Sequence, residues 1–511
     1  MNKRNALRLG VTVGVALTSV AISGTAMADE PKKVTEPSVM RESTEITQVA
    51  DAFDDDDPFD LHLSLGYQYT TKNSNVYRES AMPQVSTGGY TRDDMGIAKY
   101  SELTHRLNTR AEIGVFKDIA LIFRVPIILS NERKLDPIDE NAPHAITLMG
   151  APGEQLFRLP FRAPKRSGVE YLAVGLDFGI MNQYRSPSKP TWVIGVEGRF
   201  DVSEPMHACN ADPQPLNQPN GQINCARPSD INRDGAGDGV LREGFQLEGT
   251  FDGGRKPGVS RGVTGLELHT YLSKRIKYIE PYGGFRALIE FQNSSSDYGG
   301  ADLKGSLVNH PPLTGTMMLG LSVIPWEVRD QYQRLTLDFR LEGSYRSEGR
   351  DYSELYDALG SSDAPSLRYP KWAAYTEGPN DPTTGLPTSV VDPGSQRVYF
   401  SGLTDVQQHG IYTVSSQVTW QAGEYIKFNL GGSYTIVQSH YITFDQACNP
   451  DFKNDASKAG PCQRIDPREQ TASATGIPNP NYRVVVNVPG RRFRVDKSNA
   501  MSGWINATVM F

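Results

Sequence analysis

Apolar and polar side chains alternate in repeated runs along most of this chain. In the first run, Leu61, Leu63, Leu65, Tyr67 and Tyr69 share one face, and mostly polar side chains lie between them. A period of two is typical of a β-strand with one apolar and one polar face. The pattern therefore predicts an all-β chain. It occurs twelve times, at residues 61–70, 100–116, 118–129, 168–181, 190–203, 262–274, 276–292, 312–325, 332–346, 410–422, 424–438 and 500–511.

The lengths of these runs, and of the segments between them, indicate a membrane protein. Each run reaches the roughly 9 to 11 residues that a tilted strand needs to cross a bilayer, whereas soluble strands average about 5 to 6 residues. Long and short connections alternate, as do the extracellular loops and periplasmic turns of bacterial outer-membrane barrels. We therefore predict a transmembrane antiparallel up-and-down β-barrel of twelve strands, with both chain ends on the short-turn side. The long connections are 71–99, 130–167, 204–261, 293–311, 347–409 and 439–499, and the short ones are 116–117, 182–189, 275, 326–331 and 423.

The last run ends the chain on an aromatic side chain. Alternate residues from Met501 to Phe511 are apolar or small, and those between them are mostly polar. This strand resembles the terminal strand of Gram-negative outer-membrane β-barrel proteins of the porin and transporter kind, although that family prefers a glycine where this chain has Asn506. Residues 100–129 are similar to a strand, turn and strand of transporter-type barrels linked to the degradation of aromatic compounds. The resemblance implies a protein of the Gram-negative outer membrane, in contact with its lipid.

The chain divides into three parts. Residues 1–28 are predicted to be a secretory signal peptide, because three basic residues precede an apolar stretch at 9–22 and a small-residue cleavage site follows it. Residues 29–59 are acidic, contain four consecutive aspartates and lack periodicity, so we expect a disordered periplasmic tail. This tail lacks the apolar plug expected of a transporter of hydrophobic substrates. Residues 60–511 form the predicted barrel.

Composition and motifs narrow the range of functions. Beyond the signal peptide no apolar run reaches the roughly 18 residues of a membrane helix. The net charge of -7 argues against nucleic acid as a partner. The single His-x-Ser motif, His62 to Ser64, faces inward, whereas outer-membrane phospholipase A uses a lipid-facing pair. We therefore predict that the protein is not an enzyme.

Charged side chains occupy the polar face of several runs. One arginine or lysine facing lipid at the bilayer midplane costs about 2 to 4 kcal/mol, so this face must line the barrel interior. Eight basic and eight acidic residues balance there, whereas a strongly ion-selective pore needs a surplus of one sign. Two interpretations remain open: a salt-bridge ladder that fills a narrow barrel, and a water-filled channel for small polar or zwitterionic solutes. The predicted lumen residues are Arg106, Arg110, Glu112, Arg124, Asp177, Glu197, Arg199, Asp201, Glu267, Arg286, Glu290, Arg334, Asp338, Arg340, Glu342 and Lys427.

The four cysteines fall into two close pairs, Cys209 with Cys225 and Cys448 with Cys462. Four cysteines allow three pairings, and proximity favours the two local disulfides in an exported protein. Each would close a loop of about 15 residues and stabilise it by about 3 kcal/mol. Metal binding is the lesser alternative, because no histidine stands at ligand spacing beside either pair.

Residues 230–241 resemble an EF-hand-type or dockerin-type calcium loop. Oxygen-bearing side chains stand at positions 1, 3, 5 and 9, and Gly235 at position 6 allows the sharp turn that gathers them. Position 12, where those families place a bidentate acid, is Leu241. The alternative is an irregular coil rich in Asp, Asn and Gly. The candidate Ca²⁺ ligands are Asp230, Asn232, Asp234, Ala236 and Asp238.

Two functions are compatible with these features. The first is a channel or transporter that carries small solutes through the lumen. In that case the runs 312–325, 410–422 and 500–511 add a neutral polar wall to the charged one. The alternative is a barrel-anchored surface protein that binds a partner, or acts structurally, through disulfide-stapled extracellular loops. Loops of this length usually either have a function or are disordered.

Overall fold

The computed structural model covers the barrel and much of its connections. It describes residues 40–53, 59–83, 90–138, 154–211, 224–227, 240–241, 250–251, 256–294, 296–298, 308–362, 364–368, 397–398, 400–446, 448–450, 463–466, 471–474, 476–479 and 481–511.

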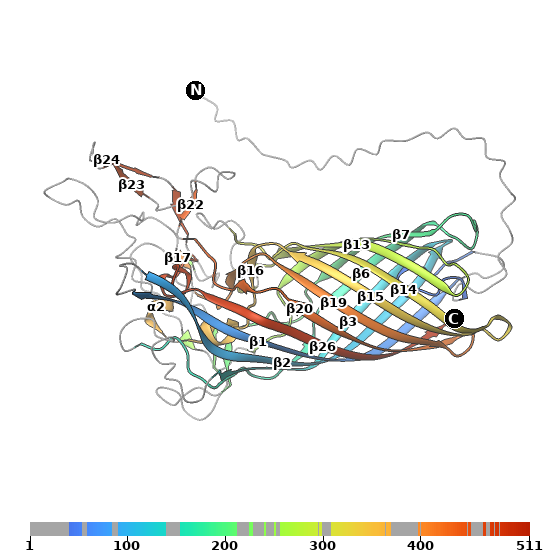
Figure 1. Cartoon of the computed structure of the whole chain (residues 1–511), viewed down its shortest axis with the longest axis horizontal. Helices are drawn as coiled ribbons and strands as arrows, with labels where there is room; N and C mark the ends of the chain where they lie inside the picture. Colours follow the sequence, from blue (N-terminus) through green and yellow to red (C-terminus); the bar gives the residue numbers. More distant parts are fainter. Residues whose placement is uncertain are drawn as a thin grey trace, which may run out of the picture.

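Twelve antiparallel strands form a closed barrel (Figure 1). Neighbours in sequence pair with one another, and the first strand pairs with the last, from His62 with Met510 to Arg78 with Phe493, which closes the ring. This confirms the predicted fold. The barrel strands are β1 (Leu61–Pro83), β2 (Tyr90–Phe116), β3 (Ile119–Pro137), β6 (Leu172–Met181), β7 (Thr191–Phe200), β12 (Val263–Ser273), β13 (Ile279–Gln292), β14 (Thr314–Val328), β15 (Gln333–Arg346), β19 (His409–Gln421), β20 (Ile426–Val437) and β26 (Phe493–Met510).

Shorter elements lie outside this ring. No helix in the described part of the chain is long and apolar enough to cross a membrane. β4 (Phe161–Arg162), β5 (Arg166–Val169) and β21 (His440–Tyr441) extend the barrel sheet. The small strands are β8 (Cys209–Asn210), β9 (Asn224–Arg227), β10 (Val240–Leu241), β11 (Thr250–Phe251), β16 (Gly349–Asp351), β17 (Arg397–Val398), β18 (Thr404–Val406), β22 (Cys448–Pro450), β23 (Gln463–Asp466), β24 (Thr471–Ala474) and β25 (Gly476–Pro478). The helical turns are η2 (Glu45–Thr47), η3 (Arg329–Gln331), α1 (Tyr356–Gly360), α2 (Pro365–Arg368) and α3 (Val484–Asn487).

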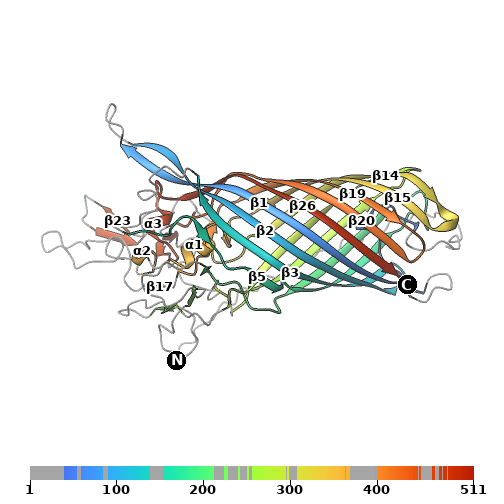
Figure 2. The same cartoon turned by 90° about the horizontal axis from the view of Figure 1, so that it is seen from below.

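Each predicted run overlaps one barrel strand, but four strands are much longer than their apolar alternation. One is β3, which continues to Pro137 although its run ends at residue 129. β1 and β2 stay paired as far as Pro83 and Tyr90, so the long loop expected at 71–99 is instead a hairpin that projects beyond the barrel (Figure 2). β26 begins at Phe493 rather than at residue 500. These extensions lie beyond the lipid, where nothing requires one face of the strand to be apolar. Period two alone therefore could not reveal them.

Apolar side chains cover the outer face of the barrel strands. Leu268, Met317, Leu341, Leu430 and Ile505 have exposed fractions from 47% to 63%. A band of this size is too apolar to face water and matches the lipid-facing belt of outer-membrane barrels. Exposed aromatic rings gather at the short-turn rim, where such rings prefer the membrane interface. They include Phe116, Tyr278, Trp326, Trp420, Tyr425 and Phe511.

The end of the barrel with the long connections is covered by a folded cap, at the left in Figure 1. We define the cap as the described residues within 154–171, 201–211, 256–262, 347–368, 400–408, 438–446 and 481–492. Its hydrophobic core joins Leu359, Ile442 and Val486 to Leu135 of β3 and Phe493 of β26. None of these five side chains is more than 2% exposed. The upper barrel and its loops thus share one apolar core.

The predicted disulfide between Cys209 and Cys225 is present and joins β8 to β9. For the second pair, Cys448 begins β22, whereas Cys462 lies outside the described residues. That bond stays a prediction, as do the signal peptide at 1–28 and the calcium site, because these residues also lie outside the described chain.

Candidate functional site

Three adjoining cavities inside the barrel bear on function. The lower chamber, of about 380 Å³, is bounded by β1, β2, β3, β20 and β26. The upper chamber, of about 310 Å³, lies between β7, β12, β13, β14, β15 and β19 at their extracellular ends. The cap chamber, of about 200 Å³, lies between β2, β3 and the cap. The lower chamber shares Arg106 with the cap chamber and Tyr171 with the upper chamber, and the upper and cap chambers share Glu170, Arg261 and Arg346, so all three adjoin one another.

The predicted charged residues meet across strands on the inner face. Arg124 of β3 donates from Nε to Oε2 of Glu197 on β7, at 2.6 Å. Arg199 donates to Oε1 of the same glutamate, at 3.0 Å, and also bonds to Glu267 of β12. Four charges predicted from three runs therefore form one network.

Most of the remaining predicted lumen residues are also paired. Arg334 lies 3.8 Å from Glu327 and also bonds to backbone carbonyls of residues 40–53. Asp201, beyond the end of β7, accepts the backbone N–H of Ser203 at 3.4 Å. Several partners were not predicted, because they stand in the connections or in the acidic tail. The pairs are Arg106 with Glu170, Arg110 with Glu112, Asp177 with His269, Glu290 with Arg261, Arg286 with Glu342, Arg340 with Asp338 and Glu342, and Lys427 with Glu45.

The two signs of charge are not equally presented to the chambers. The side chain of Arg124 is 33% exposed and that of its partner Glu197 is 3% exposed; for Arg110 and Glu112 the values are 39% and 8%. The short carboxylates lie against the wall, and the longer guanidinium groups reach into the cavities. Nine basic side chains and six acidic ones line the three chambers, so the sign balance predicted for the strands does not hold at the cavity surface. They are Arg106, Arg110, Arg124, Arg133, Arg166, Arg199, Arg261, Arg346 and Lys427, against Glu45, Glu102, Glu112, Glu170, Glu290 and Asp351.

A neutral polar wall continues the ring, as predicted. Ser64 of β1 and Thr508 of β26 share a hydrogen bond of 2.8 Å between their hydroxyls. Further along, Trp504 donates from Nε1 to Gln417 of β19, at 2.9 Å. His62, next to Ser64 in the His-x-Ser motif, lines the lower chamber, on the inner face of the barrel.

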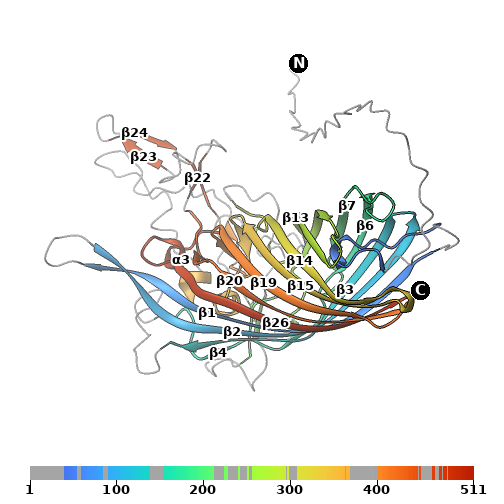
Figure 3. The same cartoon turned by 45° about the vertical axis from the view of Figure 1, so that its right-hand side comes forward.

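Residues 40–53, the plug segment, lie inside the barrel at the end with the short turns (Figure 3, dark blue). We expected residues 29–59 to form a disordered tail, and for residues 40–53 this prediction is wrong. Residues 29–39 and 54–58 lie outside the described chain. The plug segment has no periodicity, because the groups that hold it are polar and lie on distant strands.

The first half of the plug segment is held by three strands. The carboxylate of Glu280, on β13, accepts the backbone N–H of Ser43 at 2.7 Å. Arg334, on β15, donates to the carbonyl oxygen of Glu42 at 2.7 Å. The hydroxyl of Thr191, on β7, donates to the Glu42 carboxylate at 3.1 Å. Buried backbone groups of the segment therefore find partners on the barrel wall.

The second half completes the crossing. Thr47 shares a hydroxyl bond of 2.9 Å with Ser273 of β12. The Glu45 carboxylate accepts a bond from Asn429 at 2.7 Å and pairs with Lys427 at 3.5 Å, both on β20. Further bonds reach β2 and β19. The plug segment thus spans the lumen and bonds to seven strands around the ring.

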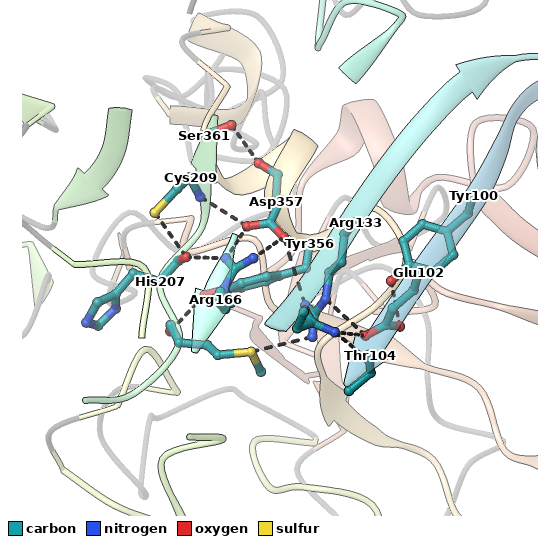
Figure 4. Close-up of polar contacts among 12 residues, drawn as sticks. Tyr100, Glu102, Thr104, Arg133, Arg166, His207, Cys209, Tyr356, Asp357 and Ser361 are labelled. Atoms are coloured by element: carbon teal, nitrogen blue, oxygen red, sulfur yellow. Dashed lines mark hydrogen bonds and ion pairs between the residues drawn. The ribbon is translucent and has the colours of Figure 1, made fainter. Parts of the chain in front are cut away.

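A buried ionic network ties the cap to the barrel (Figure 4). The carboxylate of Asp357, on α1, accepts two hydrogen bonds from Arg166, of 2.5 and 3.2 Å, and one from the backbone N–H of Cys209, at 3.1 Å. Arg133 of β3 lies 3.9 Å from Asp357 and 3.3 Å from Glu102 of β2. The helix, the disulfide-bonded strand and the barrel wall therefore share one set of charges.

The candidate calcium ligands, Asp230, Asn232, Asp234, Ala236 and Asp238, lie outside the described residues. Within the described residues, no group of three or more His, Cys, Asp or Glu side chains is arranged to hold a metal ion. Ca²⁺ binding by the 204–261 connection stays a prediction.

The closed barrel, its apolar belt and its alternating loop lengths are the features of Gram-negative outer-membrane proteins. The chain is an outer-membrane β-barrel. No family model matches it, and neither does any curated protein. Solved structures with a similar outline include the protease OmpT from Escherichia coli (8% identity, 89% of this chain and 96% of that chain, TM-score 0.26), an outer membrane channel from Pseudomonas putida F1 (8%, 88% and 95%, 0.31) and the P. putida toluene transporter TodX (9%, 94% and 93%, 0.29). At these scores the function has to be argued from the residues of this chain.

Proposed function

We propose that this protein is a channel for small polar solutes across the outer membrane, and that the plug segment is its gate. The observation that carries the proposal is the set of three adjoining chambers inside the barrel. A barrel that served only as an anchor could fill its interior with paired side chains. Here the ion pairs lie along the wall and leave space between them.

The chamber linings favour polar solutes over apolar ones. Guanidinium groups, hydroxyls and amides line the lower chamber, with Pro126 and Tyr171 among the few less polar side chains. An apolar solute would have to displace water from these groups without replacing their hydrogen bonds, which costs free energy. The chamber volumes are near the lower end of the roughly 300 to 1,000 Å³ typical of small-molecule sites.

The plug segment is suited to act as a gate because polar contacts hold it. Most of these hydrogen bonds involve a charged group and contribute about 1.5 to 3 kcal/mol each, and water can form similar bonds with the same groups. Its apolar contacts are few, centred on Met40 with Met510 and Tyr332. Release of the segment therefore exposes little apolar surface. The cap, with its hydrophobic core, is expected to stay in place.

Single-channel conductance in planar bilayers tests the proposal. We expect rare openings from the unmodified protein and at least tenfold longer open times from the double variant Glu280→Gln with Arg334→Gln, which weakens the plug contacts. Arg329→Gln is the matched control, because this arginine is 51% exposed at a periplasmic turn. If the double variant is folded and conducts no more than the control, the plug segment is not the gate. If neither variant conducts at all, the channel proposal fails.

The second candidate is a barrel-anchored surface protein, and the cap favours it. The Cys209–Cys225 disulfide and the shared apolar core make the extracellular end more elaborate than a simple pore requires. In this case the unmodified protein and the plug variants would all be non-conducting, and partner binding would depend on the cap. We propose no catalytic activity for either candidate.

We also propose that residues 230–238 bind Ca²⁺ in the extracellular connection. The test is protease protection of that loop in intact protein, with Ca²⁺ and with chelator. Asp234→Ala should abolish the protection, and Asn217→Ala, in the same connection but outside the motif, should retain it. Equal cleavage with and without Ca²⁺ in the unmodified protein would contradict the proposal.

A further inference from the structure

We propose that the upper chamber is a binding site for a small organic carboxylate with an apolar body, held by Arg261 and Arg346. The inference rests on the proposed channel function and names the class of solute that the channel carries. It starts from two arginines that stand at neighbouring positions of the chamber wall. Arg346 ends β15, and Arg261 precedes β12.

The two guanidinium groups share one carboxylate. Nη2 of Arg261 lies 3.0 Å from Oδ1 of Asp351, and Nη2 of Arg346 bonds to the other oxygen of the same side chain. Arg261 also pairs with Glu290 at 3.0 Å. Arg346 therefore depends on a carboxylate that a second cation already occupies. Asp351 and Glu290 together balance the two positive charges, but they do not use every N–H donor of the two guanidinium groups.

The same two arginines each have an unused donor. The Nε–H groups of Arg261 and Arg346 are buried, and neither has a hydrogen-bond partner among the described residues. A buried N–H without an acceptor costs about 1 to 3 kcal/mol, so a ligand that brings an acceptor to such a group recovers free energy. Nε–H is one of the donors through which arginine forms bidentate hydrogen bonds with a carboxylate. Both residues line the upper chamber, so an anion there could complete both.

Three aliphatic residues of the chamber lining explain why the ligand needs an apolar body. Val263, Leu288 and Ile411 line it. Leu288 stands between Arg286 and Glu290 in the inward-facing series of β13, where the neighbouring positions are charged. An aliphatic side chain at an inner position forms no hydrogen bonds with water in the lumen. Beside two arginines, it favours a solute with a charged end and an apolar end, such as an aromatic or branched-chain carboxylate.

The size of the chamber sets the size of the solute. At about 310 Å³, it is at the small end of ligand sites. The ring of Tyr171 also lines the chamber, with the Arg199 guanidinium 5.2 Å from its centre, so an aromatic surface stands beside a further cation. A benzoate-sized ligand fits this arrangement of two donors, a ring and aliphatic side chains.

Isothermal titration of benzoate into the detergent-purified protein tests the inference. The titration uses the unmodified chain and the Glu280→Gln, Arg334→Gln background, in which the plug cannot block entry. Benzamide, without the charge, and acetate, without the ring, are the matched probes. We expect benzoate to bind at least tenfold more tightly than either. Equal binding of benzoate and benzamide, or no benzoate binding in either background, would overturn the proposal.

Substitutions then locate the site. Arg346→Gln should weaken benzoate binding at least tenfold. Arg346→Lys, which keeps the positive charge but loses the planar pair of guanidinium N–H donors, should weaken it by a smaller factor. Leu288→Asn should reduce the preference for benzoate over acetate. Arg329→Gln should change nothing, and the heat-modifiable mobility of each folded barrel on gels controls for misfolding. Binding that Arg346→Gln and Leu288→Asn both leave unchanged would place the ligand elsewhere and overturn the assignment.

The outcome separates this inference from the proposed function. Conductance measures whether the barrel opens, whereas titration in detergent measures the chamber alone. A conducting channel without benzoate binding would refute only the carboxylate site. Benzoate binding without conductance in the plug variant would refute the channel and leave a binding site inside a closed barrel.

Discussion

The two ends of this barrel are closed by opposite kinds of chemistry. At the periplasmic end, one short segment crosses the lumen and bonds to the wall through hydroxyls, amides, carboxylates and backbone groups. At the extracellular end, several distant segments bury aliphatic and aromatic side chains in a common core. Water can replace the first set of contacts but not the second. The comparison indicates that only the periplasmic closure is suited to open and close.

The largest effect should come from emptying the apolar core. Phe493 is fully buried between Phe157 and the Arg78 guanidinium, so Phe493→Ala should destabilise the cap by about 3 to 5 kcal/mol. Limited proteolysis of the extracellular connections would detect this as faster cleavage at an unchanged barrel strand content. The matched control is Phe339→Ala on the lipid-facing side. Equal protease resistance of the Phe493 variant and that control would remove the distinction between the two closures.

The disulfide should have the next largest effect, again at the extracellular end only. Cys209→Ser with Cys225→Ser removes a cross-link that contributes about 2 to 4 kcal/mol. We expect a lower melting temperature of the cap and unchanged hydrogen exchange in residues 40–53. Exchange that rises equally at both ends would show that the closures are coupled.

Acid should strengthen the cap. Burial raises the pKa of Asp445 to about 6, and burial together with the neighbouring Asp445 charge raises the pKa of Asp405 well above its usual range; Glu348 and Arg350 face the same pair. The folded cap holds these protons more tightly than the unfolded chain, so their stabilisation is complete below about pH 4. It is lost as the pH rises through the folded pKa. The buried His440 of the cap, whose pKa burial lowers, acts in the opposite direction. The melting temperature of the unmodified protein relative to that of Asp445→Asn, measured from pH 4 to 8, therefore isolates the contribution of the Asp pair, and this difference should fall as the pH rises.

The smallest effect should come from a single plug contact. Thr47→Val deletes the 2.9 Å bond to Ser273 and should cost about 0.5 to 1.5 kcal/mol. This corresponds to a few-fold faster amide exchange in residues 40–53, with no change in the cap. If the plug amides of the unmodified protein already exchange as slowly as those of Val485 and Val486 in the cap core, the plug segment is not the weaker closure.

The barrel could be predicted from the sequence because lipid imposes a rule on every strand. Met317 of β14 and Leu341 of β15 must face hydrocarbon, so the residues on either side of each one in its strand face inward. The period of two therefore reveals both faces. The inward charges were found in the same way. Where the lipid ends, this rule ends, and the extended hairpin of β1 and β2 was missed.

The chambers could not be predicted, because their decisive residues come from irregular segments. Arg261 and Asp351 stand in long connections, and Glu45 stands in an acidic stretch with no periodicity. Their partners are distant in sequence, and a polar contact leaves no pattern in the chain. Charge counting along the strands also missed that Arg124 reaches into the cavity while Glu197 lies against the wall. That asymmetry depends on side-chain length and is visible only in the folded structure.

The position of the plug segment in the chain has a consequence for the order of assembly. Residues 40–53 leave the ribosome before any strand, yet their partners lie on β13, β15 and β20, more than two hundred residues later. They can dock only after those strands have been inserted and the cylinder has been completed. During assembly the barrel therefore passes through a stage in which the plug segment does not yet cross the lumen. The plug segment is synthesised before the strands and docks after them.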